Sequence, residues 1–476
     1  MSEKIVQADP TPFLDGEGVK LIPRMPWLNS RRLALFLIFW LVLFFAGSIL
    51  VENPFVGGSG GSDWWIGSTN YWWVVMYLHG LTVGMVGLGA LVACDALEIP
   101  SLTVRRGILA GVLVAGLTSP LGAIFDRTPP WTDAGLWVQI VAFVALDEIA
   151  ILLLWGIVEL WRSGVPRTRT FPFIAAGLSA GAVLVAAVMG HLGGWILTFG
   201  DNPSIIGWYS SQQGEGVQDF ANNLVLSHAY LMIASVLAGI VSLVAIRFGY
   251  YGLKGRTLTL ARVGMALICL DVVLQVEMAI LSGFSPWTIT TPAFITSMNG
   301  LSWVGVNDLV TLTTLTFGGA LVLIALLIGS GRLEGARFPI QVPVRATPFV
   351  MWISFAILIS ALEPPGGAGV GAPPIAWMRL YVGFFLSLML LIVVLVVERL
   401  LPTLYQNRVG WTMLVGAALT FVGCMIYIYS ALPAGGYVAV VGLVAVGGSF
   451  LATVWYGAVR PSPRASGHFL VAHRQR

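Results

Sequence analysis

Twelve long apolar stretches, separated by short polar or Gly/Pro-rich links, constrain this chain more than any other feature of its sequence. A helix of about 20 apolar residues is long enough to cross the hydrocarbon core of a bilayer. Charged residues make up only 10% of the chain, which excludes an ordinary water-soluble protein. We therefore predict an all-α, multi-pass membrane protein with helices over 31–52, 71–94, 104–124, 132–160, 172–199, 221–248, 257–283, 303–330, 346–363, 375–400, 409–431 and 437–459.

The basic residues alternate between the two sides of this predicted topology. If the N-terminus is cytoplasmic, every lysine and arginine except Arg127 and Arg379 falls in an inner segment, as the positive-inside rule requires. We expect both termini inside, with a cytoplasmic N-terminal segment (1–30), one transmembrane domain (31–459) and a basic cytoplasmic tail (460–476). The net charge of +3 reflects this bias, so it gives no reason to expect a nucleic-acid partner. The expected location is the inner (cytoplasmic) membrane.

Three of the histidines lie in the expected helices at one depth. His79 and His228 are each about eight residues into an inward-running helix, and His191 is about eight residues from the outer end of an outward-running one. At about 1.5 Å per residue, each lies roughly 12 Å below the outer boundary. An imidazole in hydrocarbon is costly without a partner, so this layer is a candidate functional site.

Four interpretations of the layer remain open at this point. They are axial ligation of haem, hydrogen-bonded core histidines that bridge helices, a histidine-only copper site and a proton relay. Neutral imidazole is a good iron ligand, and a flat macrocycle fits among packed helices. The glycines in "HG" at 79–80 and "GHLGG" at 190–194 would leave room for a porphyrin face. We favour one or two b-type haems, because no CxxCH attachment motif occurs.

A pattern of about 150 residues recurs along the chain. "YLHGLTVGMVGLGALV" begins at Tyr77, "LSHAYLMIASVLAGIV" at Leu226 and "AWMRLYVGFFLSLMLL" at Ala376. His79, His228 and Met378 are then in register, at offsets of 149 and 150 residues. A repeat of this period predicts three pseudo-repeated units of four helices each.

This topology and the "SHAYLM" segment at 227–232 resemble the haem-copper oxidase subunit I superfamily, particularly its divergent cbb3-like and NnrS-like members, in which the segment is of the "SHAHLM" type. The resemblance extends over the whole chain in topology but over few residues in motif. It implies that His79 ligates a low-spin haem and that His228 corresponds to a ligand of the active-site copper.

The chain departs from that family at its catalytic centre. The seventh helix reads "LICLDVVLQVEMAIL" where the family has a His-His pair, and the tenth reads "WMRLYVGFF" where the family has two haem-ligating histidines. We therefore expect no oxygen- or nitric-oxide-reducing centre. A haem would need an altered ligand pair, a histidine with His191 or with Met378, Met232 or Met85, and copper is disfavoured.

Several acidic residues fall well inside the predicted helices, namely Asp147, Glu148, Asp271, Glu277 and Asp308. Helical spacing places Asp271, Gln275 and Met278 on one face. These acids either join helices as protonated or hydrogen-bonded groups, or form a proton path or a quinone site.

The function expected from these features is electron transfer by a membrane haem b subunit of a respiratory or other oxidoreductase complex. Its expected partners are the lipid bilayer, other subunits, and a cytochrome c or another redox protein at the outer face, with a quinone as a further candidate. An ion-coupled transporter or channel is a second interpretation, because twelve helices with internal repeats also occur in that class. A non-catalytic structural subunit that keeps the fold is a third.

Overall fold

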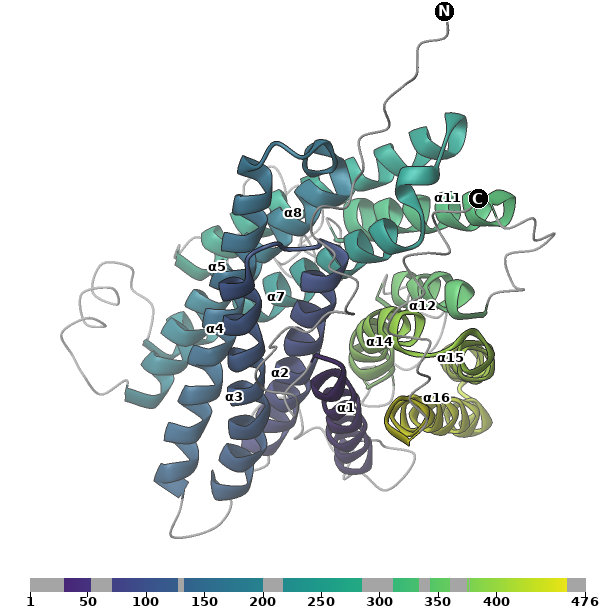
Figure 1. Cartoon of the computed structure of the whole chain (residues 1–476). Coiled ribbons are helices and arrows are strands. Elements are labelled where there is room, and N and C mark those ends of the chain that lie inside the picture. Colours follow the sequence, from purple (N-terminus) through teal and green to yellow (C-terminus); the bar gives the residue numbers. More distant parts are fainter. Residues whose placement is uncertain are drawn as a thin grey trace, which may run out of the picture.

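The computed structural model describes residues 30–52, 71–126, 132–199, 217–284, 311–333, 343–359, 375 and 377–459 (Figure 1). The regular structure in these ranges is entirely helical. The long helices are α1 (Ser30–Glu52), α2 (Tyr71–Ala96), α3 (Leu102–Asp126), α4 (Thr132–Arg162), α5 (Phe171–Phe199), α7 (Val217–Arg247), α8 (Gly255–Phe284), α11 (Phe317–Leu333), α12 (Pro343–Ile359), α14 (Ser387–Leu400), α15 (Thr403–Ser430) and α16 (Pro433–Val459). Two short 3₁₀ helices, η2 (Pro166–Arg169) and η3 (Tyr250–Gly252), lie in links, and two π-helical segments, η5 (Thr311–Thr316) and η7 (Met378–Leu386), lead into α11 and α14.

In the described part of the chain, nine helices are long and apolar enough to cross a membrane, and three shorter helices are also apolar. Each of the twelve predicted ranges overlaps one of these helices. Large apolar side chains such as Trp137, Trp155, Val444 and Trp455 are exposed on the outside of the bundle, where a soluble protein would carry charges. The prediction of an all-helical, multi-pass membrane architecture is therefore confirmed.

For description, the helices are divided in chain order into three groups of four. Helices α1–α4 form one group, α5, α7, α8 and α11 the second, and α12, α14, α15 and α16 the third (Figure 1). Consecutive helices within each group are in contact. Between groups, the last helix of one packs on the first helix of the next, giving the pairs α4–α5, α11–α12 and α16–α1, so the described helices close into a ring.

The second helix of each group faces the other two at the middle of the ring. Helices α2, α7 and α14 are all in mutual contact. Helix α14 is the most enclosed of the three, because every residue from Ser387 to Val397 is buried. An apolar surface suits a helix either in lipid or among other helices, and α14 is enclosed by other helices.

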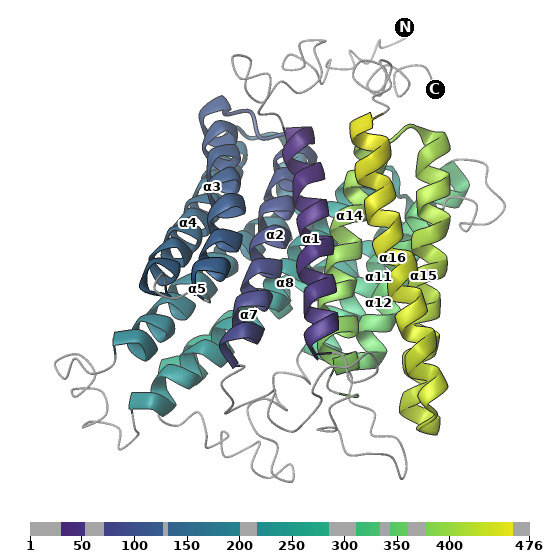
Figure 2. The same ribbon diagram turned by 90° about the horizontal axis from the view of Figure 1, so that it is seen from below.

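Charged side chains join the three central helices at one end. Arg247, the last residue of α7, pairs with Glu398 of α14 at 3.1 Å, and Arg399 of α14 pairs with Asp95 of α2 at 3.0 Å. At the same level of the ring, Arg31 near the start of α1 donates a hydrogen bond to the carbonyl of Gly457 near the end of α16. The first and last helices therefore run antiparallel and have these two ends on the same side (Figure 2).

Candidate intramembrane histidine site

The clearest polar contact between helices in the predicted layer joins α4 to α5. His191 Nδ1 lies 3.0 Å from Asp147 Oδ2, and the ring centroid of Phe143, one turn before Asp147, is 5.8 Å from that of His191. The His191 side chain is 38% exposed and that of Asp147 is 23% exposed, so the pair lies at the margin of the bundle rather than at its centre. A carboxylate that accepts the Nδ1 proton fixes the tautomer and leaves Nε2 with the lone pair.

His228 of α7 lies against the residue that precedes His191. A Cβ built at Gly190 would be 2.6 Å from His228 Cδ2 and 3.0 Å from its Nε2. Only a glycine at 190 allows this approach of the imidazole ring to α5. The His228 ring therefore occupies the open side of Gly190. The expectation that this side is free for a porphyrin face is wrong at this position. The contact agrees with the prediction that His228 and the region of His191 share one depth.

The remaining predicted ligands are described to different extents. His79 belongs to α2, but its side chain lies outside the described residues. Met378 is 0% exposed at the start of η7, and Met85 of α2 is 1% exposed, so both face the interior of the bundle. Met232, one turn after His228, is half-buried.

The predicted acids divide into two kinds. Asp271 is 0% exposed and accepts a hydrogen bond from Thr314 at 2.7 Å, and Asp147 is the partner of His191. Glu148 and Glu277 are exposed on the outside of the bundle, so counting them as buried acids is a mistake. Each is next along a helix to an inward-facing position, and one step rotates a side chain by about 100°. Asp308 lies outside the described residues.

Sequence analysis missed Thr314 and Gly190 as site residues. Thr314 lies in the "TLTTLT" segment at 311–316. Hydropathy alone assigns this segment to an apolar helix and does not distinguish its threonines. The partner of Thr314 on another helix could not be read from spacing. The sequence indicates only that Gly190 leaves open space. It does not reveal that the His228 ring occupies that space.

Asp147 of α4, His191 of α5 and His228 of α7 are side chains of the kinds that ligate haem iron or orient such a ligand. A haem needs one or two axial side chains, and an imidazole oriented by a carboxylate is a common form of such a ligand. A bare metal ion needs more: within the described residues, no three His, Cys, Asp or Glu side chains come close enough to hold one. Those residues therefore offer no complete histidine-only copper site.

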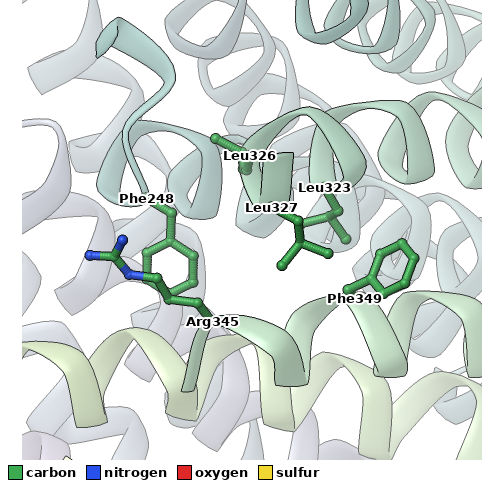
Figure 3. A pocket seen from close by; sticks show the side chains of 6 residues that line it. All are labelled: Phe248, Leu323, Leu326, Leu327, Arg345 and Phe349. Carbon is green, nitrogen blue, oxygen red and sulfur yellow. The ribbon is translucent and has the colours of Figure 1, made fainter. Parts of the chain in front are cut away.

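A small apolar pocket lies elsewhere, at the end of α7. Figure 3 shows Phe248, Leu323, Leu326, Leu327 and Phe349 around it, with the guanidinium of Arg345 turned away past the Phe248 ring. The Arg345 guanidinium carbon is 5.6 Å from the centroid of that ring, which is the geometry of a cation–π contact. No residue of the histidine layer lines this pocket, so it is not part of the candidate site.

No protein-family model matches the chain, and a search of curated proteins finds no significant relative. The functional conclusion therefore depends on the residues and on the fold.

Proposed function

We propose that this chain is a haem b-binding subunit of a respiratory or related oxidoreductase complex in the inner (cytoplasmic) membrane. In this proposal it transfers electrons between a quinol or an outer-face redox protein, such as a cytochrome c, and a partner subunit. It has no oxygen-reducing centre of its own. The observation that carries the proposal is the Asp147–His191 pair, with His228 packed on the adjacent Gly190.

The proposal includes twelve spans, in three pseudo-repeated units, with both termini inside. Equivalent contacts in the three helix groups support the repeat: α1–α3, α5–α8 and α12–α15 are one equivalent set, and α2–α4, α7–α11 and α14–α16 are another. The hydrogen bond from Arg31 to Gly457 supports an even number of crossings, because it brings the start of the first helix to the end of the last.

The protein's own residues have distinct parts in this proposal. Asp147 holds the His191 ring in one orientation and keeps Nε2 available to iron, and His228 or His79 offers a second imidazole. Met378 is the alternative second ligand, buried in η7, the segment that leads into the central helix α14. A bound haem would supply one-electron redox chemistry, and a methionine ligand would raise its potential relative to a second histidine.

An optical spectrum of the purified full-length protein tests the proposal. We expect a b-type α band in the dithionite-reduced minus oxidised spectrum. His191→Leu and His228→Leu should each lose or shift that band while the protein still inserts, because leucine keeps the apolar volume. Asp147→Asn should shift it, and Glu148→Gln is the matched control because it removes an exposed acid at the next position.

A protein without an α band and without iron by elemental analysis would contradict the haem proposal. The transporter and structural interpretations would then take precedence. Oxygen or nitric oxide reduction by the isolated subunit would contradict the absence of a catalytic centre.

A further inference from the structure

A second polar site lies deep in the bundle and takes no part in the histidine layer. Asp271 is the seventeenth residue of α8, so it lies about 24 Å from the start of that helix and about 20 Å from its end. Either measure places it near the middle of the hydrocarbon. An ionised carboxylate at that depth is strongly disfavoured unless a cation accompanies it.

The contacts of Asp271 include a hydroxyl but no counter-charge. Its Oδ1 accepts a hydrogen bond of 2.7 Å from Thr314 Oγ1 of η5, and the side chain of Gln275, one turn later on α8, also hydrogen-bonds the carboxyl. Its buried Oδ2 meets no donor at normal hydrogen-bond geometry in the described part of the chain. It forms no ion pair there. Of the titratable groups on the neighbouring helices, His191 of α5 pairs with Asp147 and Arg247 of α7 pairs with Glu398.

Close backbone packing brings Thr314 to Asp271. A Cβ at Gly264, two turns before Asp271 on the same face of α8, would be 2.5 Å from the carbonyl oxygen of Gly318 in α11. A Cβ at Gly318 would be 2.8 Å from the Gly264 carbonyl oxygen. The two glycines thus let α8 and α11 meet at their backbones, and Thr314 is one turn before Gly318.

The π-helical turn that carries Thr314 is held from the other side by α12. Trp352 is 0% exposed, and its Nε1 donates a hydrogen bond of 2.7 Å to the carbonyl of Thr316. A π-helical segment disturbs the normal ladder of the helix, and such segments occur frequently at functional sites. The site is therefore fixed by three helices and does not depend on a chance contact of one side chain.

We propose that Asp271 and Thr314 form an intramembrane proton-binding site, in which the Asp271 carboxyl carries an exchangeable proton at neutral pH. A proton neutralises the carboxylate at Oδ2 and leaves Oδ1 as the acceptor for Thr314. A metal cation would need several oxygen ligands, and within the described residues no second carboxylate, histidine or cysteine pair joins Asp271 to form a metal-binding group. The site is independent of the proposed haem, and it gives the protein a group that can take up and release a proton within the membrane.

Infrared spectroscopy of the purified full-length protein tests this site, with the proton itself as the probe. We expect the carbonyl band of a protonated carboxylic acid at pH 7, a shift of that band in D₂O, and its loss in Asp271→Asn. An ordinary aspartate at pH 7 is ionised by about a thousand to one, so a dominant protonated form is a change of at least about a thousandfold. Thr314→Val, which keeps the shape but removes the donor, should shift the band frequency.

Glu277→Gln is the matched control, because it removes an exposed acid from the same helix and should leave the band unchanged. A wild-type protein without the band, a band that persists in Asp271→Asn, or a band that does not shift in D₂O would overturn the proposal. A carboxylate signal that responds to added sodium would overturn it in favour of a metal cation. If Asp271→Asn does not fold, the D₂O shift and the Thr314→Val spectrum still decide the question.

Discussion

A single methyl group at position 190 would occupy the space of the His228 ring. Gly190 is therefore a test of how closely α5 and α7 meet in the histidine layer. Gly181, an earlier glycine of α5, has nothing within 4 Å of an added Cβ and is therefore a suitable control position. The two glycines differ only in what faces them.

We predict that Gly190→Ala displaces the His228 ring and lowers the free energy of unfolding by about 1–3 kcal/mol, the usual cost of overpacking a core position. It should also shift the proposed haem spectrum, because the ring is a candidate ligand. Thermal unfolding followed by tryptophan fluorescence in detergent, together with the optical spectrum, checks both effects. Gly181→Ala should leave both unchanged. Equal behaviour of the two variants would mean that His228 is not held against α5.

At the scale of the elements, glycines decide which helices can meet at their backbones. The pair Gly264 and Gly318 lets α8 and α11 approach closely enough for a side chain of η5 to reach Asp271. Helix association in a membrane depends on such packing, because lipid is as apolar as the helix faces and supplies no hydrophobic driving force. Small residues therefore stabilise helix association here by allowing close packing, whereas soluble proteins depend on the burial of large apolar side chains.

We predict that Gly264→Ala separates α8 from α11 and weakens the Thr314–Asp271 hydrogen bond. Because the obstacle is a backbone oxygen, no side chain can rotate away to relieve the contact. The melting temperature should fall, and the infrared band assigned to Asp271 should move in the direction seen for Thr314→Val. Gly448→Ala in α16 is the control, since an added Cβ there meets nothing within 4 Å. An unchanged band in Gly264→Ala would show that Thr314 reaches Asp271 without this close approach.

At the scale of the whole molecule, the three central helices are tied at one end by two ion pairs. The side chains of Arg247 and Glu398 are 24% and 16% exposed, so their pair is partly shielded from water. An exposed pair contributes up to about 1 kcal/mol, whereas removing one partner of a buried pair costs about 3–5 kcal/mol. The contribution of the Arg247–Glu398 pair to the free energy of unfolding should lie between these limits.

We predict that Arg247→Ala destabilises the protein by about 1–3 kcal/mol, because it leaves the carboxylate of Glu398 without its partner. The double variant Arg247→Glu/Glu398→Arg should recover part of the loss, since it restores opposite charges. Thermal unfolding in detergent measures the differences. Arg256→Ala removes an exposed arginine from the start of α8 and should have little effect. A double variant less stable than Arg247→Ala would contradict a direct interaction.

The proposed topology predicts which side of the membrane each link occupies. In a variant without Cys94, Cys269 and Cys424, a cysteine at Thr128 should react with a membrane-impermeant maleimide added to intact cells. A cysteine at Ser466 should react only after the cells are permeabilised. The reverse pattern would overturn the orientation, and labelling of both from outside would overturn the even number of crossings.

The sequence alone determined the class of the protein, because burial in lipid is encoded locally: about 20 apolar residues suffice for one helix. It also indicated where the helices lie. The repeat of about 150 residues, which would give α2, α7 and α14 equivalent places, stays a prediction. For the predicted helices at 303–330 and 346–363, the described helical segments end at Leu333 and begin at Pro343, and the predicted bounds at 303 and 363 lie outside the described residues. The twelve-span count and the orientation stay predictions.

Only the tertiary structure decided which polar groups meet. The sequence put Glu148 beside Asp147 and Glu277 two residues after Gln275, yet the two glutamates face outward, while Asp147 reaches His191 and Asp271 reaches Thr314. Hydropathy records how apolar a segment is, but not how its helix is rotated about its axis. That rotation is set by the close fit between neighbouring helices, as at Gly190 against His228 and at Gly264 against Gly318, and such contacts join residues from separate helices.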